Sequence, residues 1–103
     1  MSSTRTLLIV DDDELLRRAL SEQLMAQGEF QVIEEAIDGL SALAKSKAKV
    51  FDIILLDIGL PDMDGRDVCR KMREQGVRSP IIMLTAADSD DDTITGLNAG
   101  AND

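Results

Sequence analysis

Acidic side chains stand where the apolar runs of this sequence end. Asp11, Asp12 and Asp13 follow the first such run, and Asp57 follows the most hydrophobic one. The sequence contains no His and a single Cys, which excludes a His-based triad, a His general base and a Cys/His zinc site. Carboxylate oxygens alone suit a hard cation, most naturally Mg²⁺. Beside such an ion, an Asp carboxylate can attack phosphorus and form an acyl phosphate.

The elements that must position these acids are short apolar runs typical of strands buried on both faces. They cover residues 6–10, 51–56 and 80–85. A fourth run, over residues 31–36, contains two glutamates and predicts an edge strand. The continuous apolar character of the other three predicts a parallel sheet that is covered by helices.

Segments with helical periodicity separate the strands. Their apolar stripes are Leu16, Leu20 and Leu24, then Leu40, Leu43 and Ala44, then Val68, Cys69 and Met72, then Ile94 and Leu97. Gly28 is expected to stop the first helix, Asp38 to cap the second and Asp64 to cap the third, while the fourth helix is expected over residues 88–100. This alternation predicts an α/β sheet with right-handed crossovers and helices on both faces.

The carboxyl ends of parallel strands form one edge of an open sheet, and ligands bind in the crevice there. We therefore expect Asp11, Asp12 and Asp57 to converge beside the hydroxyl of Thr85. Clustered carboxylates raise one another's pKa unless a cation is present, so the cluster indicates a metal site. The alternative is that acids at strand ends are solvated or cap the next helix. For Asp13, both interpretations stay open.

The overall composition narrows the classes of function. With 103 residues the chain has room for one domain. Its net charge of −9, with two Phe as its only aromatic residues, argues against nucleic-acid binding and an anionic membrane surface. No apolar run reaches the roughly 20 residues of a membrane span, and the first one is too short for a secretory signal. We therefore expect a soluble cytoplasmic protein.

Three motifs, in this order, resemble the receiver domains of two-component response regulators. They are LIVDDD over residues 8–13, LLDIGLPDMDG over residues 55–65 and PIIMLTA over residues 80–86. Residues 99–103 resemble the run that leads into that family's fifth strand. The resemblance covers essentially the whole chain. It implies a doubly wound parallel sheet in the flavodoxin-like, CheY-like order 2-1-3-4, and a phosphorelay switch that at most catalyses its own phosphorylation and dephosphorylation.

The resemblance assigns roles to individual residues. It implies that Asp57 is the phosphoacceptor, charged from a phosphohistidine on a sensor histidine kinase or a phosphotransfer protein. Thr85 would be the switch hydroxyl that moves toward the phosphoryl group, and Ala86 the small residue that leaves access to it. Pro61 and Gly65 would shape the loop after the phosphoacceptor.

The resemblance also implies a Mg²⁺ or Mn²⁺ site beside the phosphoacceptor. Asp12 and Asp57 would ligate the ion directly, and Asp11 would act through a metal-bound water. Gly59 would offer its backbone carbonyl, so its side chain plays no part in ligation. No contact with nucleic acid or membrane is expected from this domain.

The resemblance stops where the sequence stops, at Asp103. The family continues into a fifth strand, which carries an aromatic switch residue and a Lys, and then into a fifth helix. We therefore expect a receiver domain over residues 1–103 that is C-terminally incomplete and lacks the Lys that pairs with the phosphoryl group. The fourth strand, over residues 81–84, would then be an exposed apolar edge, which favours a homodimer.

Three other functions stay open. A haloacid-dehalogenase-like phosphatase also has an Asp nucleophile and Mg²⁺ at a strand end, but it needs a second Asp two residues later, where this sequence has Gly59. A flavodoxin-like cofactor domain would need a Ser/Thr/Gly-rich loop after the first strand, where three acids stand here. The third is a phosphorylation-incompetent receiver fragment that acts only as an interaction domain.

Overall fold

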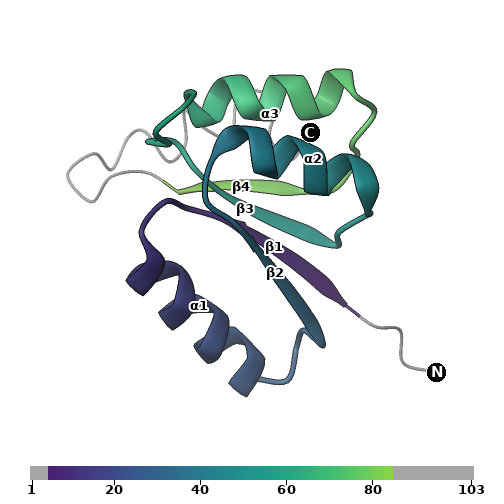
Figure 1. Ribbon diagram of the computed structural model, residues 1–103. Helices are drawn as coiled ribbons and strands as arrows, with labels where there is room; N and C mark the ends of the chain where they lie inside the picture. Colours follow the sequence, from purple (N-terminus) through teal and green to yellow (C-terminus); the bar gives the residue numbers. More distant parts are fainter. Residues whose placement is uncertain (1–4, 85–103) are drawn as a thin grey trace.

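The computed structural model describes residues 5–84, which alternate strictly between strand and helix (Figure 1). The strands are β1 (Thr6–Val10), β2 (Val32–Ala36), β3 (Ile53–Asp57) and β4 (Ile81–Leu84), and the helices are α1 (Glu14–Ala26), α2 (Gly39–Ala48) and α3 (Gly65–Glu74). Among these residues, no helix is long and apolar enough to cross a membrane. Some of the predicted features lie outside the described residues, namely the helix expected over residues 88–100, the segment 99–103, Thr85 and Ala86.

The four strands form one parallel sheet in the order β2-β1-β3-β4, which confirms the expected strand order. The run with two glutamates, now β2, is an edge strand of this sheet, as predicted. Val10 pairs with Leu56, the residue before Asp57. Because β1 and β3 are neighbours and end at this level, the acids that follow β1 lie beside the acid that ends β3.

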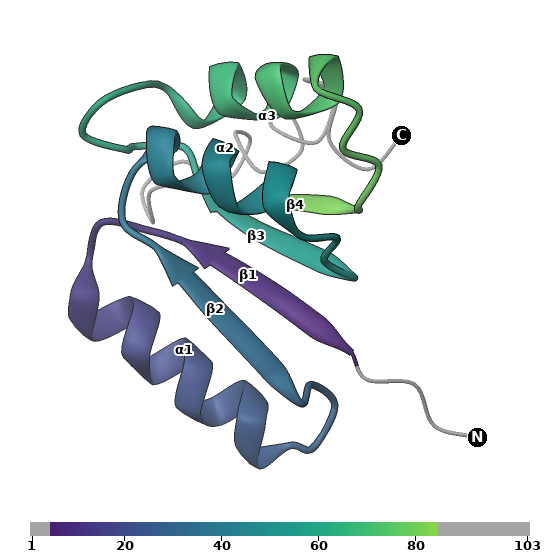
Figure 2. The ribbon, with the colours of Figure 1, turned by 45° about the vertical axis from the view of Figure 1, so that its right-hand side comes forward.

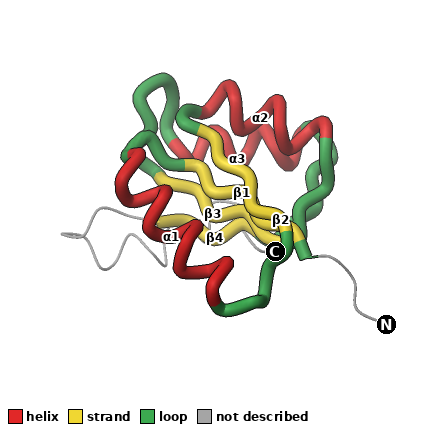
Figure 3. The backbone as a smooth tube through the Cα atoms, turned by 60° about the horizontal axis from the view of Figure 1, so that its bottom comes forward, coloured by secondary structure: helices red, strands yellow, loops and turns green. Residues whose placement is uncertain are grey.

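Helices cover both faces of the sheet. Figures 2 and 3 show α1 against one face and α2 with α3 against the other. The larger core lies between the sheet and the α2–α3 pair, and its buried members are Leu8, Val10, Ala36, Ala42, Leu43, Phe51, Ile54, Leu56, Val68, Cys69, Met72, Ile81 and Met83. The stripe expected on α3 is therefore confirmed, with Val68, Cys69 and Met72 fully buried.

The side of α2 that is buried differs from the side that the apolar pattern predicted. Leu43 is buried as predicted, but Leu40 is 66% exposed and Ala44 is exposed. The other buried positions on this helix are small, namely Gly39, Ala42 and Ser46. A Cβ at Gly39 would overlap the side chain of Met63, so α2 approaches its neighbours at positions that have little or no side chain. The prediction of Leu40 and Ala44 as buried residues was wrong because close packing against α3 decides which side of α2 is buried.

Helix α1 covers its face of the sheet only in part. Leu20 and Leu24 are half-buried, whereas Leu16 is 46% exposed. The buried residue of this helix is a charged one, Arg17. The periodicity thus predicted which side of α1 faces the sheet, but it did not predict a buried arginine there.

Each helix begins behind an aspartate whose side chain accepts a hydrogen bond from a backbone amide of the first turn. Asp38 and Asp64 are the caps that the sequence predicted. Asp13, for which two interpretations were open, caps α1. Gly28 follows the end of α1 with a φ of 76°, a conformation that favours glycine, and this confirms it as the helix stop.

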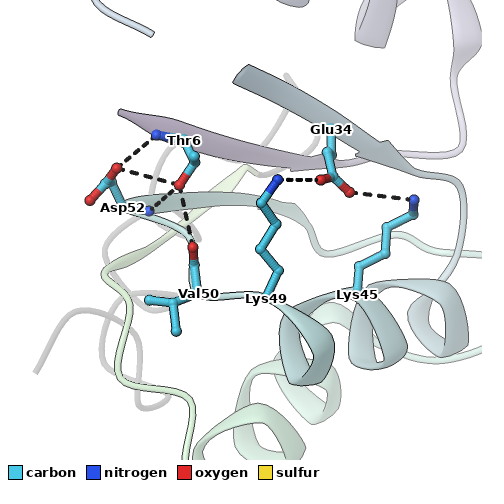
Figure 4. Close-up of polar contacts among 6 residues, drawn as sticks. All are labelled: Thr6, Glu34, Lys45, Lys49, Val50 and Asp52. Atoms are coloured by element: carbon cyan, nitrogen blue, oxygen red, sulfur yellow. Dashed lines mark hydrogen bonds and ion pairs between the residues drawn. The ribbon is translucent and has the colours of Figure 1, made fainter. Parts of the chain in front are cut away.

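Polar contacts join the elements at the amino-terminal edge of the sheet (Figure 4). Asp52, directly before β3, accepts a hydrogen bond of 2.7 Å from the backbone amide of Thr6, and its own amide donates to the Thr6 carbonyl at 3.0 Å. Glu34 on β2 contacts Lys45 at 3.7 Å and Lys49 at 2.8 Å, both on or next to α2. The Asp52 contacts join the start of β3 to the start of β1, and the Glu34 contacts join β2 to α2.

Candidate functional site

Three carboxylates meet at the carboxyl edge of the sheet. One side-chain oxygen each from Asp11, Asp12 and Asp57 lies within 4.8 Å of the others. Asp11 is buried, Asp57 is half-buried and Asp12 is exposed. The convergence expected from the strand ends is therefore present, with two residues from the β1–α1 connection and one from β3.

Backbone contacts hold Asp11 on both sides. Its amide donates to the carbonyl of Ala36 at 3.0 Å, which continues the β1–β2 ladder by one residue. Its carbonyl accepts from Nη1 of Arg17 at 2.7 Å, and its carboxylate accepts from the amide of Asp13 at 2.9 Å. The turn that carries Asp11 and Asp12 is thus fixed by strand, helix and side-chain contacts together.

Arg17 is a site residue that the sequence analysis missed. Besides the Asp11 carbonyl, it contacts Glu35 on β2, with 2.7 Å between Nε and Oε1, and its side chain is 10% exposed. A buried charge is tolerated when it is paired and hydrogen-bonded, as this one is. The available signal was its position on the same side of α1 as Leu20 and Leu24, where a solvated arginine is not expected.

The chain turns tightly after Asp57. The amide of Gly65 donates to the carbonyl of Ile58 at 2.8 Å, and a Cβ at Gly65 would overlap the carbonyl oxygen of Asp57. Gly59 is exposed and pairs with Asp64 across the loop in an isolated antiparallel bridge. The close approach of α3 to the end of β3 therefore requires glycine at position 65, as the loop-shaping role predicted.

The electrostatics of the cluster oppose full ionisation. Burial raises the pKa of Asp57, repulsion from Asp11 and Asp12 adds to this rise, and the backbone amides of Gly59 and Ile58 counteract it. Burial also raises the pKa of Asp11, against the hydrogen bond that it accepts from the Asp13 amide. A divalent cation would lower the pKa of both Asp57 and Asp11 because it compensates the negative charge of their ionised forms.

The donor set fits Mg²⁺ or a similar hard cation. The cluster offers carboxylate oxygens only, and it is open on the side of the exposed Asp12, where water can complete the coordination. The roles that the resemblance implies for Gly59, Thr85 and Ala86 stay predictions. Of these, Thr85 and Ala86 lie outside the described residues.

The raised pKa of Asp57 has a measurable effect on stability in the absence of divalent cations. Stability linked to this carboxyl is fully present below its ordinary pKa of 3.8 and is lost as the pH rises through the raised value. Asn has a similar shape and no charge, so we expect Asp57→Asn to raise the melting temperature at neutral pH by about 2 to 5 °C. Melting curves at several pH values should show this gap closing as the pH falls. A variant that melts below the wild type at neutral pH would contradict the account.

Comparisons with known proteins match the chain from β1 onward. A family model for the response regulator receiver domain matches residues 7–103. The alkaline phosphatase synthesis transcriptional regulatory protein PhoP of Bacillus subtilis is 41% identical over 99 residues, which are 96% of this chain and 40% of that protein. The probable transcriptional regulatory protein TcrX of Mycobacterium tuberculosis is 41% identical over 98 residues, which are 95% of this chain and 41% of that protein. The chain therefore spans about 40% of the length of these curated relatives.

Solved structures share the same architecture. The signal receiver domain of the putative response regulator NarL from Mycobacterium tuberculosis has a TM-score of 0.85 and 30% identity, covering 97% of this chain and 81% of that chain. The CheX-CheY-BeF₃-Mg²⁺ complex from Borrelia burgdorferi has a TM-score of 0.82 and 31% identity, covering 94% of this chain and 73% of that chain. The strand order and the helices on both faces are thus a shared fold.

Proposed function

The chain belongs to the response regulator receiver domain family, which serves two-component phosphorelay signalling, and from this membership we propose that Asp57 accepts the phosphoryl group. The observation that carries the proposal is the position of Asp57 at the end of β3, with its carboxylate grouped with those of Asp11 and Asp12. The half-buried side chain is open enough to meet a donor. It is also desolvated enough to favour a bound cation.

In the proposed reaction, a carboxylate oxygen of Asp57 attacks the phosphorus of a phosphohistidine on a sensor kinase or a phosphotransfer protein. The new bond joins this oxygen to phosphorus, and the bond between phosphorus and the imidazole nitrogen breaks. The nitrogen keeps the electron pair and takes up a proton. Asp57 then carries an acyl phosphate, which is the signal.

The proposed cofactor is Mg²⁺, held by Asp12 and Asp57 directly, by Asp11 through water and by the carbonyl of Gly59. When bound, the ion supplies charge compensation for the phosphoryl oxygens. The composition of the Borrelia CheY complex, which contains BeF₃ and Mg²⁺, supports this choice. The chain's own part is to hold its carboxylates together through the contacts of Arg17 and the tight turn at Gly65.

No observation favours the other functions. Gly59 stands where a haloacid-dehalogenase-like phosphatase needs its second Asp, and the loop after β1 consists of acids, which would repel a cofactor phosphate. We propose that the domain acts as a phosphoacceptor switch, with catalysis limited to its own phosphorylation and dephosphorylation. For the protein as a whole, we propose that phosphorylation changes contacts with a partner or an output segment.

The test uses acetyl phosphate as a small-molecule donor. We expect intact-mass spectrometry to show the gain of one phosphoryl group when the protein is incubated with acetyl phosphate and Mg²⁺. The gain should disappear when EDTA replaces Mg²⁺, because the carboxylate cluster then repels the donor. A folded protein that gains no mass with Mg²⁺ would support the interaction-domain alternative and contradict the proposal.

A further inference from the structure

An acidic side chain in the loop after β3 binds the first turn of α2. Asp62 accepts a hydrogen bond of 2.8 Å from the amide of Gly39 at Oδ1 and one of 3.0 Å from the amide of Leu40 at Oδ2. Figure 2 shows this loop and the start of α2 at the same end of the molecule. Because its two oxygens bind two successive amides, the side chain fixes the loop in both position and orientation.

A packing contact next to these hydrogen bonds holds the same two segments together. Met63, the next residue of the loop, lies against Gly39, where a Cβ would overlap its side chain. Met63 also packs against the main core, although it is only partly buried itself. The loop is thus attached to α2 by a polar and an apolar contact in succession.

The other end of the loop is bonded to the candidate site. The amide of Leu60 donates to the carbonyl of Ile58 at 3.1 Å, and the bridge between Gly59 and Asp64 closes the loop. Gly65 is pressed against the Asp57 carbonyl at the start of α3. The segment from Ile58 to Asp64 therefore runs between two anchors, the end of β3 and the first turn of α2.

The first turn of α2 also has a cap of its own. Asp38 accepts from the amide of Ser41 at 2.8 Å, and the Ser41 hydroxyl completes a capping box. Asp38 and Asp62 therefore bind the same helix terminus from different segments. Of these two aspartates, Asp62 is the one that connects the terminus to the loop that contains Gly59.

We infer that Asp62 is a positioning residue of the metal site. By binding α2, it holds the Ile58–Asp64 loop in place, and this loop contains Gly59, whose amide binds Asp57 and whose carbonyl is the proposed ligand. The inference rests on the proposed function, since the site that Asp62 positions is the proposed Mg²⁺ site. Asp62 itself does not touch the ion or the phosphoryl group.

The test compares Asp62→Ala with Asp38→Ala by isothermal titration calorimetry with Mg²⁺. Both variants lose hydrogen bonds to the first turn of α2, so both should lower the melting temperature. We expect only Asp62→Ala to raise the Mg²⁺ Kd, by about 3- to 10-fold, which is at or below the roughly 10- to 100-fold effect of groups that bind a metal ligand directly. Asp62→Asn, which keeps one acceptor oxygen, should recover part of the affinity.

A second condition separates positioning from charge. In about 0.5 M KCl the long-range attraction of an exposed carboxylate is screened, so a charge effect would vanish there while a positioning effect persists. The inference is overturned if Asp62→Ala and Asp38→Ala change the Kd equally, or if the effect of Asp62→Ala disappears in high salt. A wild type that binds no Mg²⁺ would instead refute the proposed function, and this inference with it.

Discussion

Replacing Asp57 with Asn is expected to abolish phosphoryl uptake from acetyl phosphate, with a loss in rate of at least about 10³-fold. The reason is that the amide lacks the anionic oxygen that attacks phosphorus. The fold should remain, because Asn has a similar volume and Asp57 is only half-buried at the end of β3. Intact-mass spectrometry over time, together with a circular dichroism spectrum of each protein, measures both expectations.

Asp52→Asn is the matched control for this prediction. Asp52 lies just before the same strand, at the opposite edge of the sheet, where it binds Thr6. The same chemical change at this position should leave phosphoryl uptake in place. Uptake by Asp57→Asn at the wild-type rate would rule out Asp57 as the acceptor.

Replacing Phe51 with Ala is expected to have the largest effect on stability. Phe51 is 1% exposed and belongs to the core between the sheet and the α2–α3 pair. Truncation of a buried Phe costs about 3 to 5 kcal/mol, a large part of the roughly 5 to 15 kcal/mol that stabilises a typical domain. Urea unfolding followed by circular dichroism measures the loss, since the chain has no Trp or Tyr for fluorescence.

The neighbouring residue provides the control. Val50 is 85% exposed, so Val50→Ala should change the free energy of unfolding by no more than about 0.5 kcal/mol. If Phe51→Ala lowered the free energy of unfolding as little as Val50→Ala does, burial of Phe51 in this core would not contribute to stability as we expect.

The features that the sequence alone predicted correctly depend on local patterns and on one topological rule. The apolar runs identified the four described strands, and Asp38 and Asp64 were predicted as the caps of α2 and α3. The grouping of Asp11 and Asp12 with Asp57 followed from the rule that parallel strands end at a common edge. None of these features requires knowledge of how side chains pack.

What the sequence did not predict depends on contacts between distant segments. The buried side of α2 depends on the close packing of Gly39 against Met63 and against Val68 of α3, which the apolar periodicity of α2 does not reveal. Arg17 is buried because Glu35 on β2 and the carbonyl of Asp11 in the β1–α1 connection both bind it. The partners of Asp62 lie more than twenty residues earlier in the chain, so its role had no local signal.

The most direct test of the central claim is to locate the phosphoryl group on the chain. Borohydride reduces an aspartyl phosphate to homoserine, and peptide mass spectrometry then identifies the converted residue. After incubation with acetyl phosphate and Mg²⁺, the account predicts homoserine at position 57 and at no other acid. Homoserine at Asp11, Asp12 or another acidic residue, with position 57 unchanged, would contradict it.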